Sequence, residues 1–110
     1  GDAHLIVAQV DAGSQDTLKD VADRVRSKLK PALVVLGANI NGRPAFLVAA
    51  TPELVGRGVH AGNLIKDIAS VAGGGGGGKP DLAQAGAKDP GRLADALEAA
   101  RRLGREALEG

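Results

Sequence analysis

The feature that most constrains the fold of this chain is its shortage of large side chains. One Phe is the only aromatic residue among 110, and Met, Tyr, Trp and Cys do not occur. Because 44% of the residues are apolar and 25% charged, the composition is that of a globular domain. We therefore expect one domain over residues 1–110, with a core of Ala, Val, Leu and Ile. No apolar run approaches the roughly 20 residues of a membrane span, so no membrane contact is expected.

Apolar patterns in the first third of the chain predict a strand followed by a helix. Residues 5–10 are predicted to be a mostly buried strand. From Leu18 onward, apolar side chains recur at i, i+3, i+4, i+7 and i+11, which indicates an amphipathic helix. Ser14 or Asp16 can cap this helix, and Pro31 ends it.

A β-hairpin is predicted next. Residues 32–36 form a continuous apolar run, which is typical of a strand covered on both faces. Asn41-Gly42 separates this run from the apolar residues 44–50, and both turn residues readily take positive φ. Phe46, in the second strand, is expected in the core.

The remainder predicts two helices around a glycine connector and a short strand. Residues 51–58 are predicted to be a loop and residues 61–72 an amphipathic helix. Because ordering glycine is entropically costly, the run 73–78 is expected to be a connector without regular structure. Residues 82–87 are a predicted strand, and 93–108 the last helix. The resulting order β-α-β-β-α-β-α predicts an α/β domain with a mixed four-stranded sheet and helices packed on it.

Charge is divided unevenly along the chain. The net charge is −4 over residues 1–23, +6 over residues 24–88 and −1 over residues 89–110. An anionic partner would be attracted to the middle segment. Helix-end charges and a solvated surface would produce the same distribution, so both interpretations stay open.

The glycine run 73–78, which Lys79 follows, resembles a phosphate-binding loop only superficially. A P-loop requires Ser or Thr after the lysine and a preceding strand, whereas here Pro80 follows and a helix precedes. Nucleotide binding by that mechanism is therefore not expected. Glycine backbone could still approach a phosphate closely, with Lys79 adding charge. A mobile connector explains the run equally well.

No catalytic or metal site is predicted. His4 and His60 lack the third nitrogen ligand or the carboxylates that a metal or acid–base site needs. His60 begins a helix and is expected to be a structural or ligand-contact residue in its first turn. Since Phe46 is the only aromatic residue, RNA could be bound by shape and phosphate contacts but not by base stacking.

Three segments in one order carry a family resemblance. They are the helix Gly58–Ala69, the glycine run with Lys79–Gly86, and Lys88–Pro90. This combination resembles the C-terminal, DHH-associated domain of bacterial alanyl-tRNA synthetases, most densely over residues 56–97. The resemblance implies a cytoplasmic domain that binds the elbow of alanine tRNA and helps aminoacylation and editing domains of the parent chain to act on one tRNA.

The resemblance also implies what lies outside this segment. In the family, ATP, alanine, magnesium and zinc are bound by upstream domains, so no cofactor is expected here. A helical coiled coil that supports dimerisation usually precedes the domain, and without it a homodimer stays an open question. The expected RNA-binding residues are Arg57, His60, Lys66, Gly75, Gly76, Gly77, Gly78, Lys79 and Lys88.

Two alternatives remain. The related domain of DHH phosphoesterases binds nucleic-acid or nucleotide phosphate, but there the glycine run is typically followed by His-Pro, where this chain has Lys79-Pro80. The other alternative is a purely structural dimerisation module.

Overall fold

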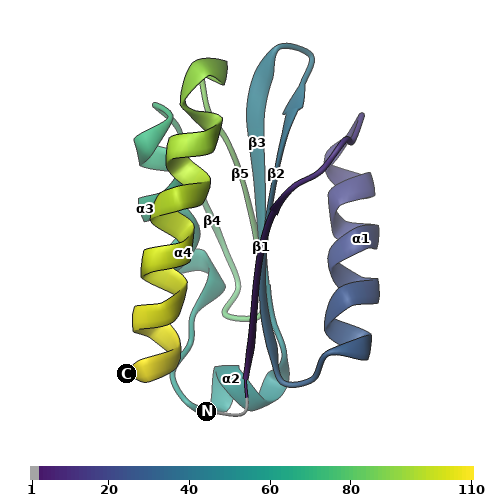
Figure 1. The fold of residues 1–110 in the computed structure, drawn as a ribbon, viewed down its shortest axis with the longest axis vertical. Coiled ribbons are helices and arrows are strands. Elements are labelled where there is room, and N and C mark those ends of the chain that lie inside the picture. Colours follow the sequence, from purple (N-terminus) through teal and green to yellow (C-terminus); the bar gives the residue numbers. More distant parts are fainter. Residues whose placement is uncertain (1–2) are drawn as a thin grey trace.

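A computed structural model describes residues 3–110, which form three layers (Figure 1). A five-stranded sheet with the spatial order β1-β2-β3-β5-β4 lies in the middle. Helix α1 covers one face, and α3 and α4 cover the other. The elements are β1 His4–Gln9, α1 Gln15–Lys28, β2 Ala32–Ile40, β3 Arg43–Ala50, α2 Pro52–Gly56, α3 Ala61–Val71, β4 Gly75–Gly78, β5 Leu82–Gly86, the 3₁₀ turn η1 Pro90–Arg92 and α4 Leu93–Glu109.

The β2–β3 hairpin is the centre of the sheet. Asn41 and Gly42 at its tip have φ of 54° and 79°, the positive values that a two-residue hairpin turn requires. Every residue from 45 to 50 is buried. Strand β1 runs parallel to β2, and β3 runs antiparallel to it. The predicted hairpin and the predicted parallel crossover are both confirmed.

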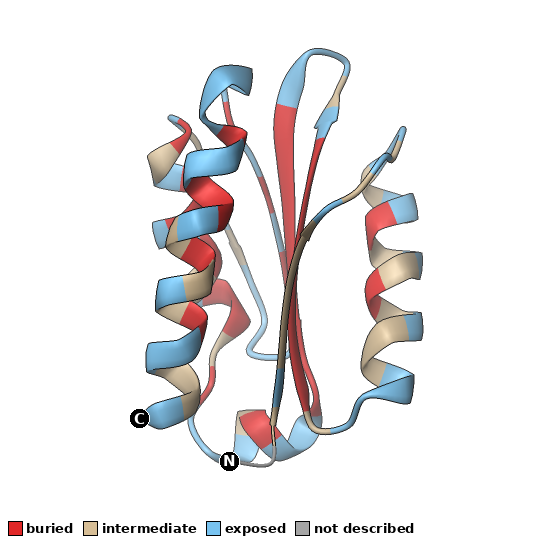
Figure 2. Cartoon of the chain, in the orientation of Figure 1, coloured by how far each residue is buried: buried red, intermediate tan, exposed pale blue. Residues whose placement is uncertain are grey.

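Side chains of the hairpin alternate between the two faces, so each face has its own apolar cluster. On one face, Leu18 and Ala22 of α1 pack with Leu47. On the other, Phe46 is 0% exposed and packs in a cluster that includes Ile65 of α3 and residues of α4. Figure 2 shows this burial along the hairpin and on the inner sides of the helices. The predicted core position of Phe46 is confirmed.

Helix α1 begins and ends as its sequence predicts. The Ser14 hydroxyl accepts a hydrogen bond from the Thr17 N–H at 3.2 Å, so Ser14 is the N-cap. The helix ends at Lys28, shortly before Pro31. None of the helices within residues 3–110 is long and apolar enough to cross a bilayer.

Two predictions about the second half are wrong. The expected connector 73–78 contains β4, which pairs antiparallel with β5, so the sheet has five strands rather than four. Glycine can join a sheet edge through its backbone alone, although no side-chain pattern marks it. The expected loop 51–58 contains α2, which starts with Pro52 at its first position and buries Leu54. Burial of that one leucine anchors a helix too short to show a periodic pattern.

Candidate nucleic-acid interface

Strand β4 is one edge of the sheet and consists only of glycine. It pairs with β5, Gly75 lying opposite Gly86 and Gly78 opposite Ala83. No strand of the described chain pairs with its other side. Gly75, Gly76 and Gly78 are exposed. The strand therefore presents main-chain atoms and has no side chains of its own.

The glycines of this run differ in what the fold requires of them. A Cβ added at Gly74, Gly76 or Gly78 would come within 2.1, 2.5 and 2.6 Å of atoms of β5, distances that no real Cβ adopts. At Gly75 an added Cβ would meet nothing within 4 Å. At Gly77 it would meet only the end of a lysine side chain, at 3.7 Å. Packing thus explains three of these glycines, whereas Gly75 and Gly77 leave space that packing does not use.

Carbonyl oxygens of the turn after β4 accept hydrogen bonds from the first amides of α3. The N–H of Ala61 donates to the carbonyl oxygen of Pro80 at 2.8 Å. The N–H of Gly62 donates to the carbonyl oxygen of Lys79 at 3.2 Å. Because these amides are already bonded, the start of α3 does not offer them to an anion. Any phosphate contact here must come from side chains or from the glycine backbone.

His60 is the N-cap of α3. Its Nδ1 accepts a hydrogen bond from the Asn63 N–H at 3.1 Å, so in the neutral imidazole the proton lies on Nε2. None of the described residues bonds to Nε2, which leaves it as a donor. His60 therefore has a structural role as the cap of α3, one of the two roles that the sequence predicts, and contact with a ligand stays a prediction. No three His, Asp or Glu residues within 3–110 are grouped so that they could hold a metal ion.

Two lysines flank the exposed side of β4. Lys66 is exposed on α3, and its Cε is the atom that an added Cβ at Gly77 would meet. Lys79 is exposed at the start of the turn, where its N–H donates to the Leu82 carbonyl oxygen at 2.9 Å. Neither lysine forms an ion pair with any residue of the described chain, whereas Arg101 of α4 pairs with Glu98 at 3.1 Å. The charge of both lysines is therefore available to an external anion.

An open depression of about 420 Å³ lies at the other end of β4. Its lining combines Gly73–Gly75, Gly86–Lys88 and the first residues of β3, Arg43 and Pro44. Lys88 is held there by its N–H, which donates to the Ala72 carbonyl oxygen at 3.2 Å. Sequence reasoning missed Arg43, and the available signal was its position directly after the hairpin turn.

Arg57 lies apart from this group. It follows α2 and lines a separate depression of about 280 Å³ with Leu54, Val59 and the last residues of α4. The structure therefore brings together the glycines 75–78, Lys66 and Lys79, with His60 at one end and Lys88 at the other, but it does not bring Arg57 to them.

Comparisons with known proteins identify relatives of this chain. The family model described as the DHHA1 domain matches residues 2–106. An alanine–tRNA ligase of Chloroflexus aurantiacus is 49% identical over 96 residues, and one of Natranaerobius thermophilus is 45% identical over 96 residues. Each match covers 87% of this chain but 11% of the relative, so the chain spans about a ninth of their length.

A solved structure has the same fold. The C-Ala domain of the Aquifex aeolicus alanyl-tRNA synthetase superposes with a TM-score of 0.78 at 28% identity. The match covers 98% of this chain and 91% of that one. The likeness therefore extends over the whole architecture.

Proposed function

We propose that this chain, which belongs to the DHHA1 domain family, binds the elbow of tRNA as part of an alanine–tRNA ligase. The surface that carries this role is the exposed glycine strand β4 with the lysines beside it, Lys66 and Lys79, and with Lys88 at its far end. In the parent protein it would hold one alanine tRNA while the aminoacylation and editing domains act on it in the cytoplasm. Cofactor chemistry would belong to those other domains.

One observation supports the proposal above the others. Gly75 and Gly77 are free of any packing requirement, yet they carry no side chain, and unpaired lysines flank them. A side-chain-free strand lets a rigid RNA backbone approach the main chain closely. The adjacent ammonium groups can then contact phosphates, which carry no base identity.

The mode of recognition follows from the missing aromatic residues. Phe46 is buried in the core, so no Phe, Tyr or Trp ring is available for base stacking. Binding would therefore depend on the folded shape of the RNA corner and on phosphate charge, and only weakly on tRNA identity.

The test is a salt series with three RNAs: folded alanine tRNA, a different folded tRNA and an acceptor-stem minihelix that lacks an elbow. We expect comparable affinities for the two full tRNAs and a clear loss with the minihelix. Affinity should fall with salt, each engaged phosphate adding about 0.7 to 0.9 to the slope of log K against log salt concentration. Undiminished minihelix binding would contradict elbow recognition and move the contact to the acceptor arm.

The alternatives give different results in the same titrations. Binding to a short single-stranded oligonucleotide as tight as to tRNA would favour the phosphate-binding role of DHH phosphoesterases. A domain that binds no RNA but self-associates in sedimentation experiments would favour a dimerisation module.

A further inference from the structure

The turn that carries Lys79 is held by bonds from both faces of the sheet. Three consecutive carbonyl oxygens are involved, those of Lys79, Pro80 and Asp81. The first two accept the N–H groups at the start of α3, at 3.2 and 2.8 Å. The third accepts the Ala50 N–H at 2.9 Å and a guanidinium N–H of Arg26 on the opposite face. Arg26 is thus the only side chain that donates to these three carbonyls within residues 3–110.

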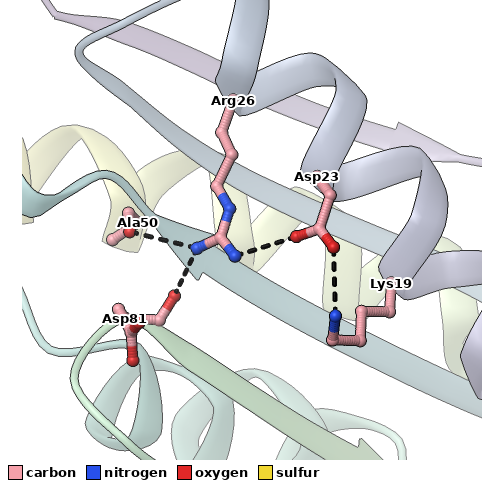
Figure 3. A network of polar contacts seen from close by, with 5 residues as sticks. All are labelled: Lys19, Asp23, Arg26, Ala50 and Asp81. Atoms are coloured by element: carbon pink, nitrogen blue, oxygen red, sulfur yellow. Dashed lines mark hydrogen bonds and ion pairs between the residues drawn. The ribbon is translucent and has the colours of Figure 1, made fainter.

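Arg26 reaches the turn from α1, and both of its terminal nitrogens donate hydrogen bonds to protein acceptors (Figure 3). Its Nη1 donates to the carbonyl oxygens of Asp81 at 3.2 Å and Ala50 at 3.4 Å. Its Nη2 donates to Asp23 Oδ1 at 2.8 Å, and Lys19 contacts the other carboxylate oxygen at 3.0 Å. The planar fork of arginine suits this division between two carbonyls and a carboxylate, whereas a lysine ammonium would not reproduce it.

We propose that Arg26 is a positioning residue for RNA binding, which acts by fixing the backbone on which Lys79 stands. This inference rests on the proposed function. Lys79 has a long, exposed side chain, and a fixed backbone reduces the conformational entropy that binding would cost. Because both terminal nitrogens of Arg26 already donate to protein acceptors and its side chain is only 22% exposed, the inferred role acts through the turn rather than through a phosphate contact.

The experiment compares Arg26→Ala with Arg24→Ala, which removes the same charge from an exposed position of the same helix. Affinity for folded alanine tRNA is measured well below the unfolding temperature of each variant. We expect Arg26→Ala to weaken binding about fivefold and Arg24→Ala less than about twofold. Arg26→Lys retains the charge without the fork, and it should behave like Arg26→Ala; it is also the second variant if the alanine variant does not fold.

A double-mutant cycle with Lys79→Ala isolates the mechanism. In the Lys79→Ala background, Arg26→Ala should cause no further loss, because the side chain that the turn presents is gone. An independent additional loss would mean that Arg26 contacts the RNA itself, and it would overturn the inference. Equal effects of Arg26→Ala and Arg24→Ala would also overturn it.

Hydrogen exchange separates this inference from the function on which it rests. Arg26→Ala should accelerate exchange of the Ala50 and Lys79 N–H groups, whether or not RNA is present. Unchanged exchange at both amides would show that Arg26 does not hold the turn. A wild-type domain that does not bind tRNA would overturn the proposed function, and any role of Arg26 in binding with it.

Discussion

Strands β3 and β4 flank the same strand, β5, yet they are built on opposite principles. Ala85 of β5 lies between Phe46 on one side and Gly76 on the other. Phe46 is fully buried, whereas Gly76 is exposed and has no side chain. Strand β3 is specified by its own apolar side chains. Strand β4 is specified by its neighbour, since backbone pairing with β5 holds it in place and the lack of room for a Cβ requires glycine at positions 76 and 78.

The comparison assigns different tasks to the two strands. Buried apolar area in β3 contributes to the stability of both apolar clusters. Strand β4 buries no side chain, and its exposed backbone is what a ligand would meet. We therefore expect substitutions in β3 to affect folding stability, and substitutions at the open glycines of β4, Gly75 and Gly77, to affect ligand binding.

The largest effect is expected at Phe46. Phe46→Ala removes the largest fully buried side chain and should lower the free energy of unfolding by about 3–5 kcal/mol. Urea denaturation measures this loss. A decrease below about 1 kcal/mol would show that the core collapses to fill the space, and that β3 is less important than its burial indicates.

A matched pair within β4 tests the steric division of its glycines. Gly76→Ala places a Cβ 2.5 Å from that of Ala85 and should cost about 2–3 kcal/mol, because two strands must separate. At Gly77 an added Cβ has room, and φ lies outside the positive range. The free energy of unfolding of Gly77→Ala should therefore be within about 0.5 kcal/mol of the wild-type value or above it. The same denaturation experiment measures both. Equal losses would contradict the division.

Charge reversal tests whether β4 is the binding side. The double variant Lys66→Glu, Lys79→Glu should weaken tRNA binding about tenfold or more, since two phosphate contacts become repulsive. Its control reverses Arg102 and Arg105, which are exposed on α4 and form no ion pair within residues 3–110. Filter binding or fluorescence anisotropy gives both affinities. Equal losses would mean that the attraction is diffuse charge.

The smallest expected effect is a pH dependence of the folding stability, which comes from Asp23 on α1. The hydrogen bond from Lys19 lowers the pKa of Asp23 below its ordinary value of 3.8, and Arg26 lowers it further, although desolvation opposes both. A lowered carboxylate pKa stabilises the fold above the unfolded value, and this stability is lost as the pH falls through the folded pKa. Because the Asp23 side chain is 38% exposed, the contribution is about 0.5 kcal/mol at most.

Asp23→Asn measures that contribution. The difference in unfolding free energy between wild type and variant should be present at pH 7 and decline progressively as the pH falls below 3.8 and through the lowered pKa of folded Asp23. Exchange should rise mainly at the Ala50 amide, at the end of β3 beside the turn, and not in the rest of the hairpin. A difference that persists at acid pH would assign the effect to packing rather than charge.

Residue patterns alone were sufficient for much of the fold. The Asn41-Gly42 turn, the continuous apolar strands and the helical stripe that begins at Leu18 each report burial through side chains close in sequence, and all three are confirmed. The family resemblance rested on equally local motifs, and the DHHA1 match over residues 2–106 confirms it. RNA binding by the predicted residues stays a prediction.

Local patterns could not place contacts between distant segments. Arg43 shares a depression with Lys88, Arg57 lies apart from the other predicted residues, and Arg26 reaches the carbonyl of Asp81. Each of these depends on where separate elements meet after packing. Residues that are close in sequence do not indicate which distant elements will come into contact.

The sequence by itself determined the hairpin, the amphipathic helices and the family, because apolar side chains and turn residues act over a few positions. Only the tertiary structure decided that the glycine run is a strand. Glycine has no side chain to signal burial and few intrinsic preferences, so its conformation here is set by the backbone of β5 and by the space that β5 leaves. Because β4 has no side chains, no residue pattern predicted it. For the same reason it exposes main-chain atoms at the edge of the sheet.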